Sequence, residues 1–278
     1  MAVIDEMLHA ANEEGFFNES AESKVCQDIV LKALAESSFN RNVTIKGGVV
    51  MRSITKSARR ATQDMDIDFI RYSLNDDSIR LFIDKLNCLP DIRIEQSGEI
   101  EELRQEDYFG KRVHIIISDS NGKAIESKVD IGVHKHMDIA QEEFCFDIAC
   151  FEDGANLLIN SREQMFVEKL RSLLKFGANS TRFKDIFDLC YLSDSVDRKR
   201  LETCLEAFVF LNPGMRENST QDVVRRVENT FLNPKYVARL STSRKNWLDM
   251  PVEEVLLKLK KFLRSLSGSA ENVSVIGK

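Results

Sequence analysis

Three aspartates in one short stretch are spaced so that they could share a metal ion. Asp64, Asp66 and Asp68 alternate with apolar residues, and the stretch reads Asp-Met-Asp-Ile-Asp-Phe. In a β-strand the three carboxylates would share one face, about 6–7 Å apart along the strand. Carboxylates this close repel one another without a counter-charge. The spacing therefore indicates a site for a divalent cation. The alternative is an acidic strand end that binds nothing.

A later strand supplies a further carboxylate. Residues 111–118 and 123–133 form a predicted β-hairpin, because the turn between them, Asp119–Gly122, contains Asn-Gly. In the return strand Asp130 alternates with apolar residues, which places it on the polar face. It is either a third metal ligand from a neighbouring strand or a solvent-facing aspartate.

Two other features suit a phosphate group. Gly47 and Gly48 follow Lys46 between a short predicted strand and a predicted helix from about Val49. Glycines there let backbone N–H groups approach an anion closely, although an ordinary tight turn is the alternative. A basic run before the acidic stretch consists of Lys56, Arg59 and Arg60. It is either a solvated loop or a contact to a triphosphate or nucleic-acid backbone.

These oxygen ligands favour Mg²⁺. This ion bridges carboxylates to substrate phosphates, and two such ions can stabilise both the attacking and the leaving oxygen of an in-line displacement. His134 and His136 would share a strand face if the return strand continues, but a zinc site needs further ligands in a recognisable arrangement. None is evident in the sequence. The constellation suits phosphoryl or nucleotidyl transfer assisted by one or two Mg²⁺ ions.

The first half of the chain mixes helical and strand patterns. Helices are expected over 19–38 and 76–89, with a short helical or irregular lead-in before them. The expected strands, besides the hairpin and the acidic stretch, are 43–45, 91–94 and 144–148. Residues 157–160 are expected to lead into the next helix.

The second half shows helical periods alone. Ser161-Arg-Glu-Gln164 is a capping box that opens a helix to about Lys175. The core stripe of this helix is expected to be Phe166, Leu170, Leu173 and Leu174. Further helices are expected over 182–192, 201–211, 221–231, 235–240 and 252–266, with a frayed tail from about residue 267. The fold class is therefore α+β: a mixed-sheet core followed by a helical lobe.

The composition limits the class of protein. The chain has 278 residues, 43% of them hydrophobic and 30% charged, as in soluble globular proteins. It contains no apolar run of about 18 residues, so we expect no membrane span. Its acidic N-terminus is unlike a secretory signal.

Cysteine usage and charge add two expectations. The six scattered cysteines are interpreted as buried thiols in a reducing cytosol, and the expected location is cytoplasmic. The net charge of −6 argues against a general nucleic-acid coat, but it allows a local basic groove.

The motifs, taken in order, resemble those of the AbiEii-type (AbiEii/AbiGii) nucleotidyltransferase toxins of the DNA polymerase β-like superfamily. That superfamily usually has Gly-Ser before its Asp-x-Asp, whereas this family often has Gly-Gly, as here. The matching residues are Lys46-Gly47-Gly48, Arg60-x-Thr62-x-Asp64-x-Asp66, Glu168-Lys169-Leu170 and Arg182-Phe183-Lys184-Asp185-x-x-Asp188-Leu189. The resemblance covers about residues 40–195 and leaves the later helices unassigned.

The resemblance implies a nucleotidyltransferase lobe over 1–157 and a helical lobe over 158–278, with the active site between them. It implies Mg²⁺, an NTP substrate and the toxin half of a bacterial toxin–antitoxin or phage abortive-infection pair, hence an antitoxin partner. A tRNA 3′ end is the acceptor it suggests. The alternatives are the same chemistry on a protein hydroxyl, or a non-catalytic nucleotidyltransferase-like binding module.

The resemblance also implies roles for individual residues. Asp64 and Asp66 would bind metal, and Asp130 would bind metal and act as the base. Lys169 would reach a phosphate, with Asp185 as the acidic residue of the last motif. The residues implied in nucleotide binding are Lys46, Gly47, Gly48, Arg60, Thr62 and Asp188.

Two points stay open from the sequence. Counting from Arg60-x-Thr62 selects Asp64 and Asp66, but counting from the apolar residue after the pair allows Asp68 to replace Asp64. Without the resemblance, Lys169 would be a surface lysine on an amphipathic helix. Asp185 and Asp188 would then pair with Lys184 or Arg182 at helical spacing, which stabilises a helix only slightly.

Overall fold

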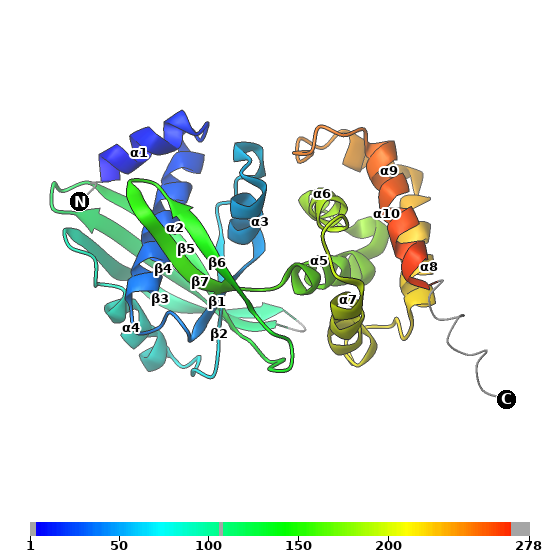
Figure 1. Ribbon diagram of the computed structural model, residues 1–278, viewed down its shortest axis with the longest axis horizontal. Coiled ribbons are helices and arrows are strands. Elements are labelled where there is room, and N and C mark those ends of the chain that lie inside the picture. The colour runs from blue at the N-terminus through cyan, green and yellow to red at the C-terminus, as the bar shows by residue number, and fades with distance from the viewer. Residues whose placement is uncertain (1–3, 106–107, 268–278) are drawn as a thin grey trace. The chain divides into compact units, whose positions relative to one another are not determined.

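A computed structural model describes residues 4–105 and 108–267 of the chain, which divides into two compact units, Met1–Asn160 and Ser161–Lys278 (Figure 1). The first unit is built on a sheet and the second is helical, as the α+β prediction requires. The predicted frayed tail lies outside the described residues, apart from its first position.

The sheet of the first unit has seven strands in the order β3-β4-β5-β2-β1-β7-β6 (Figure 1). The strands are β1 (Val43–Lys46), β2 (Met65–Phe69), β3 (Ile92–Gln105), β4 (Tyr108–Asp119), β5 (Ala124–Val133), β6 (Glu142–Ile148) and β7 (Phe151–Ile159). The central strand β2 runs antiparallel to β1 and parallel to β5. The sheet is therefore mixed, and the acidic stretch lies at its centre.

The two faces of the central strands differ as their alternation predicts. The residues on one face are almost fully buried and are Met65, Ile67, Phe69, Val129 and Ile131. The other face carries the aspartates. Helices and a short 3₁₀ turn complete the unit: α1 (Ile4–Glu13), α2 (Glu19–Glu36), α3 (Gly47–Thr55), α4 (Asp76–Lys85) and the turn Ala58–Arg60. The long helix α2 packs against β5, β6 and β7 and is buried along most of its length.

Several expected boundaries were wrong. Residues 157–160 do precede the helix that begins at Arg162, but 157–159 also end a strand that was not predicted, β7, which pairs with β1 and β6. The strand expected over 91–94 continues to Gln105, since β4 supplies a long antiparallel partner. The helix expected from Val49 begins at Gly47. Strand β5 ends at Val133, so His134 and His136 do not continue its alternation.

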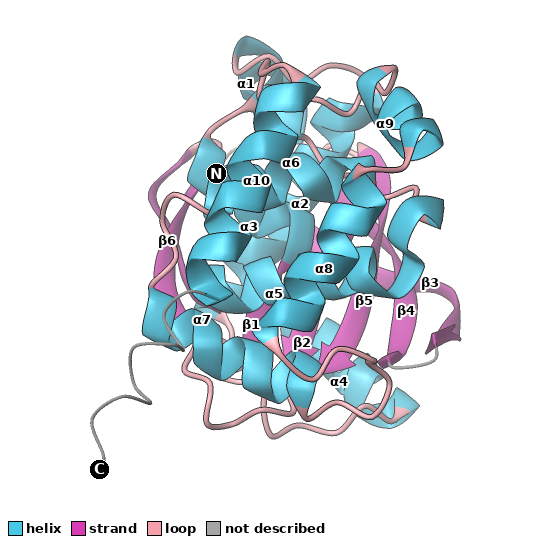
Figure 2. Ribbon diagram, turned by 90° about the vertical axis from the view of Figure 1, so that its right-hand side faces the viewer, coloured by secondary structure: helices cyan, strands magenta, loops and turns pink. Residues whose placement is uncertain are grey.

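The second unit contains six α-helices among its described residues (Figure 2). They are α5 (Arg162–Phe176), α6 (Phe183–Leu192), α7 (Arg198–Leu205), α8 (Thr220–Phe231), α9 (Pro234–Ser241) and α10 (Val252–Ser267). The helix expected over 201–211 is instead α7 followed by one turn of π-helix, Glu206–Phe210. Gly177–Asn179 forms a 3₁₀ turn between α5 and α6.

The capping box and the core stripe of α5 are confirmed. The Ser161 side chain accepts a hydrogen bond from the Gln164 backbone N–H at 3.1 Å, which fixes the start of the helix. The predicted stripe residues are all buried: Phe166, Leu170, Leu173 and Leu174. They pack α5 against α6, α7 and α8.

The prediction of six buried thiols was wrong for half of them. Cys26, Cys190 and Cys204 are buried, whereas Cys88, Cys145 and Cys150 are exposed. Cys88 lies in the turn after α4, Cys145 on the edge strand β6 and Cys150 in the turn after β6. All six are free. Across the described part of the chain, no helix is long and apolar enough to cross a membrane.

Candidate functional site

The strand pairing brings two of the predicted metal ligands face to face. Asp66 on β2 lies directly opposite Asp130 on β5 in the parallel register, and opposite Lys46 on β1 in the antiparallel register. Neighbouring strands are about 5 Å apart, so the Asp66 and Asp130 side chains leave the same face of the sheet as neighbours. Asp64 precedes Asp66 by two residues and continues the row along that face.

Each end of this carboxylate row (Asp64, Asp66 and Asp130) is held by a basic side chain. Lys128 Nζ lies 2.8 Å from an Asp64 carboxylate oxygen. Arg112 on β4 donates two hydrogen bonds to Asp130, at 2.7 and 2.8 Å. These bonds to Asp130 raise the pKa of the Arg112 guanidinium above its ordinary value, so Arg112 stays charged. The counter-charge that the row requires is therefore present on β4 and β5.

The two glycines allow the backbone to approach the row closely. Gly47 has φ +68°, and a Cβ atom added there would lie 2.5 Å from an Asp66 carboxylate oxygen. A Cβ atom added at Gly48 would lie 2.4 Å from the Thr62 hydroxyl oxygen. Both positions thus have no room for a side chain, and Gly47 also needs the left-handed conformation. The first turn of α3 is packed directly against Asp66 and Thr62.

Asp68 differs from the other aspartates of the stretch. Its side chain is 8% exposed and forms an ion pair with Lys46 at 2.6 Å, whereas the Asp64 side chain is 49% exposed. A buried carboxylate already paired with a lysine is poorly placed to exchange partners. The structure therefore favours Asp64 over Asp68 as the companion of Asp66. It also gives Lys46 a structural partner.

The row fits a divalent cation by the chemistry and the position of its donors. All three side chains supply carboxylate oxygens, which Mg²⁺ prefers. Within residues 4–105 and 108–267, no three His, Cys, Asp or Glu side chains already converge as metal ligands. Asp64 and Asp130 are turned instead to Lys128 and Arg112. An ion would replace these cations, and Asp66 and Asp130, which are paired in register, would be among its ligands.

The basic run before β2 is not a single exposed surface. Arg60 is buried at the end of its 3₁₀ turn. Lys56 is exposed and pairs with Asp147 of β6 at 3.0 Å. The two residues therefore lie in different surroundings. Their predicted contact with a triphosphate stays a prediction.

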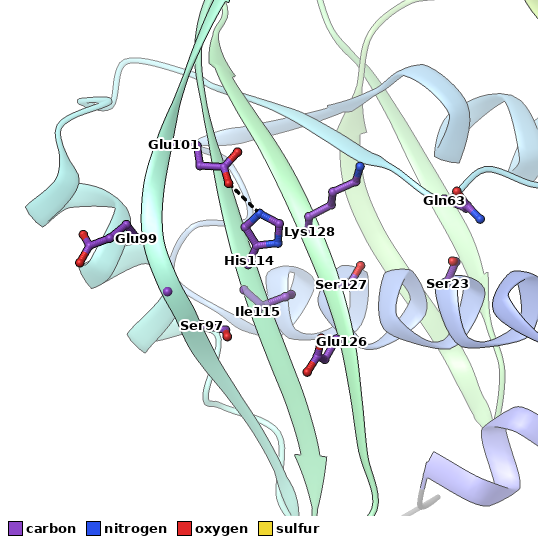
Figure 3. Close-up of a pocket in the computed structure, with 11 residues that line it drawn as sticks. Ser23, Gln63, Ser97, Glu99, Glu101, His114, Ile115, Glu126, Ser127 and Lys128 are labelled. Carbon is purple, nitrogen blue, oxygen red and sulfur yellow. Dashed lines mark hydrogen bonds and ion pairs between the residues drawn. The ribbon is translucent and has the colours of Figure 1, made fainter.

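A pocket of about 520 Å³ adjoins the row (Figure 3). Lys128, which pairs with Asp64, forms part of its wall, so the pocket and the row are contiguous. His114 lies between Lys128 and Glu101 and contacts the Glu101 carboxylate at 3.2 Å (Figure 3). Gln63, just before the acidic stretch, also lines the pocket. The walls are polar and offer both donors and acceptors of hydrogen bonds.

The residues predicted from the second half form a buried network in the helical unit. Lys169 on α5 lies 3.2 Å from Asp185 and 2.7 Å from Asp188, both on α6. The indole N–H of Trp247 donates to Asp188 at 2.9 Å, and Arg182 pairs with Asp185 at 2.7 Å. Lys169 is therefore no solvated surface lysine. Asp185 does pair with Arg182 at helical spacing, but it also binds Lys169.

The sequence analysis did not predict three residues that contact the predicted site residues: Arg112, Lys128 and Trp247. The hairpin over 111–133 contained the information needed to place Arg112 and Lys128. Its Asn-Gly turn sets the register that places Arg112 opposite Asp130 and His114 opposite Lys128. Trp247 carried no such signal, because it lies 59 residues from Asp188 and only the folded helices bring them together.

A family comparison covers both units. A model of the family described as Nucleotidyl transferase AbiEii toxin, Type IV TA system, matches residues 29–248. This span contains every predicted site residue, from Lys46 to Asp188. No curated protein matches the chain.

Proposed function

The chain belongs to the nucleotidyl transferase AbiEii toxin family of type IV toxin–antitoxin systems, and from this we propose that it is a Mg²⁺-dependent toxin that transfers a nucleotide from an NTP to RNA. The acceptor we propose is a tRNA 3′ end. The antitoxin is a second proposed partner. The single observation that carries the proposal is the pairing of Asp66 with Asp130 in register, with the backbone of Gly47 packed against Asp66.

The chain's own residues have distinct parts in this reaction. Asp64, Asp66 and Asp130 would hold Mg²⁺, which when bound offsets the negative charge of the phosphate oxygens. Asp130 would accept the proton of the acceptor hydroxyl as a general base once it is released from Arg112. The hydroxyl oxygen forms a bond to the α-phosphorus of the NTP, the bond to the bridging oxygen breaks, and pyrophosphate leaves. Lys128 and Arg112 supply positive charge beside the row for the triphosphate.

The helical unit contributes a lysine held in one position. We assign Lys169 to a substrate phosphate and Asp185 to the acidic position of the same motif, as the family resemblance implies. Asp188 and Trp247 position Lys169, because Asp188 is fully buried and bonds both the ammonium group and the indole. The pocket beside Lys128 gives the nucleoside of the NTP a polar surface to bind.

Two measurements on one pair of proteins test this function. The parent protein should inhibit growth when expressed, and its melting temperature should rise with Mg²⁺ plus an NTP, because a ligand that binds the folded state stabilises it. Asp66→Asn should abolish both effects while the melting temperature without ligand stays near that of the parent. Growth inhibition equal to that of the parent would contradict catalysis as the cause of toxicity.

The same measurements separate the alternatives. A non-catalytic binding module of this fold predicts no Mg²⁺-dependent shift with any NTP. Modification of a protein hydroxyl predicts NTP binding like that of the RNA enzyme, but labelled nucleotide would appear in protein. Among these, the paired carboxylates favour catalysis, because a module that only binds a partner has no use for a row of mutually repelling acids.

A further inference from the structure

The two units carry opposite net charge. Residues 1–160 contain 18 Lys and Arg and 30 Asp and Glu, which gives −12, whereas residues 161–278 contain 21 and 15, which gives +6. The overall charge of −6 therefore hides a basic half. A charge difference of this kind between the halves of a chain is typical of proteins in which one part binds a polyanion.

The positive charge of the helical unit is concentrated in two segments. Residues 169–184 contain five Lys or Arg, and residues 229–248 contain four, and neither segment contains an Asp or Glu. The first runs from α5 through the 3₁₀ turn to the start of α6. The second covers the end of α8, all of α9 and the loop that follows.

The fold brings these two segments into contact. Arg239 on α9 donates a hydrogen bond to the Ala178 carbonyl oxygen at 2.5 Å, and its guanidinium lies 5.6 Å from the centre of the Phe183 ring. Arg226 on α8 donates to the Leu174 carbonyl oxygen at 3.0 Å. Both guanidinium groups are thus fixed against the 3₁₀ turn. Fixing them in advance reduces the entropy that a ligand must overcome.

Three cations at this place have no acidic partner. Among the residues that the structure describes, Arg226, Lys235 and Arg239 have no carboxylate within ion-pair distance, although all three are exposed. Other cations nearby are paired: Arg225 with Asp222 at 3.5 Å and Arg264 with Glu228 at 2.5 Å. Lys235 and Arg239 are one helical turn apart on α9, so they share a face. Positive charge is left available here and not elsewhere on α8.

We propose that this basic patch (Arg226, Lys235 and Arg239) binds the phosphate backbone of the RNA acceptor. Each arginine uses one N–H group on a carbonyl and has others left for phosphate oxygens. Phe176, 51% exposed, precedes the glycine that Arg226 covers, and it offers a ring on which an unpaired base can stack. The patch rests on the proposed function, since it names where that enzyme holds its RNA. Contacts to phosphates read no sequence, so we expect the patch to give affinity rather than base specificity.

The test is the salt dependence of RNA binding. The probe is end-labelled unfractionated tRNA, and the dissociation constant is measured over a range of NaCl concentrations for the full chain. The variants are the parent, the double variant Arg226→Gln/Arg239→Gln, and the matched control Arg225→Gln on the same helix. The double variant should bind about ten-fold or more weakly at low salt, and the slope of log K against log salt should fall by about 1–2. The control should keep the affinity of the parent within about two-fold.

A second variant tests the patch without removing a side chain that supports the fold. Lys235→Gln removes a side chain that makes no hydrogen bond or ion pair with the described residues, and its slope should fall by about 1. Parental affinity and slope in both the double variant and Lys235→Gln would overturn the proposal. So would an equal loss in Arg225→Gln. Unchanged RNA affinity with lost binding to an acidic protein partner would assign the patch to that partner and overturn the RNA assignment.

This result is distinguishable from failure of the proposed function. If the parent transfers no label from any NTP, the proposed function fails, whatever its affinity for tRNA. If the parent labels RNA and the double variant labels it at the same rate at low RNA concentration, the proposed function is supported and the proposal that the basic patch binds RNA is overturned.

Discussion

Acidic side chains serve different purposes in the two units of this chain. In the sheet unit, Asp64 is half exposed and Asp130 is partly exposed, and each holds one cation across neighbouring strands. In the helical unit, Asp188 is fully buried between Lys169 and the Trp247 indole. Both sets join carboxylates to basic groups at 2.7–2.8 Å, so distance alone does not distinguish them.

Access to water distinguishes Asp64, whose side chain is 49% exposed, from Asp188, whose side chain is fully buried. An exposed carboxylate can exchange its partner at little cost, because solvent screens the charges while the exchange takes place. A buried pair resists exchange, since either charge left alone inside the protein is strongly unfavourable. The sheet row is therefore suited to binding an ion and a substrate, and the helical network is suited to holding Lys169 in place. The predictions below test this contrast.

The largest effect is expected on the carboxylate row. Asp66→Asn removes a charge but keeps the shape, so nucleotidyl transfer should fall by about 10³-fold or more while the melting temperature changes little. The matched control is Asp68→Ala in the same strand. It removes the carboxylate that pairs with the mostly buried Lys46 ammonium group and should cost about 3 kcal/mol of unfolding free energy. Transfer assays and urea unfolding on both variants check this. A large loss of stability in Asp66→Asn would break the contrast.

The next effect is expected in the buried network. Asp188→Ala leaves the Lys169 ammonium short of a buried partner and should lower the unfolding free energy by about 3–5 kcal/mol. Asp194→Ala, in the same unit, removes the exposed partner of Lys258 and should cost at most about 1 kcal/mol. Urea denaturation of both variants measures the difference. Equal costs would show that burial does not separate the two kinds of pair.

A third prediction concerns the glycine against the row. Gly47→Ala should push the Asp66 carboxylate aside and lower transfer by about 10–100-fold, because small displacements in a reacting site are costly. Gly122→Ala is the control: its φ of +83° imposes similar strain, but no atom lies within 4 Å of the added Cβ. Each should lose about 1–2 kcal/mol of stability. Kinetics and thermal unfolding of the two variants show whether the contact with Asp66 lowers transfer beyond the effect of backbone strain.

The smallest effect is expected in the pocket beside the row. His114→Ala removes a ring from the wall and should raise the KM for the NTP a few-fold with little change in kcat, because the wall binds the nucleoside and not the reacting phosphorus. Steady-state kinetics with each of the four NTPs test this. A fall in kcat at constant KM would place His114 in the chemistry instead.

The sequence was sufficient for the elements whose pattern is local. The alternation in the acidic stretch and the Asn-Gly turn of the hairpin are short-range signals, and together they placed Asp66 and Asp130 on polar faces of two strands. The capping box at Ser161 likewise fixes a helix start within a few residues. These features depend on residues close together in the chain, so they can be predicted without knowledge of the fold.

The rest depends on partners far along the chain. Residues 151–159 include Gly154 and Asn156, which are weak strand formers, and they become β7 because β1 and β6 pair with them. Residues 95–105 are rich in Glu and read poorly as a strand, yet β4 extends them. Arg112 and Lys128 are a similar case, because the carboxylate with which each pairs can be identified only when the strand register is known. Trp247 reaches Asp188 through helix packing alone.

The most direct test of the central claim follows the nucleotide. The purified parent protein is incubated with Mg²⁺, NTPs labelled at the α-phosphate and total cell lysate, alongside Asp66→Asn. We predict label in small RNA with the parent and none with Asp66→Asn. Label in RNA at equal levels with both proteins would contradict the assignment of chemistry to the carboxylate row. Label in protein alone would contradict the RNA acceptor.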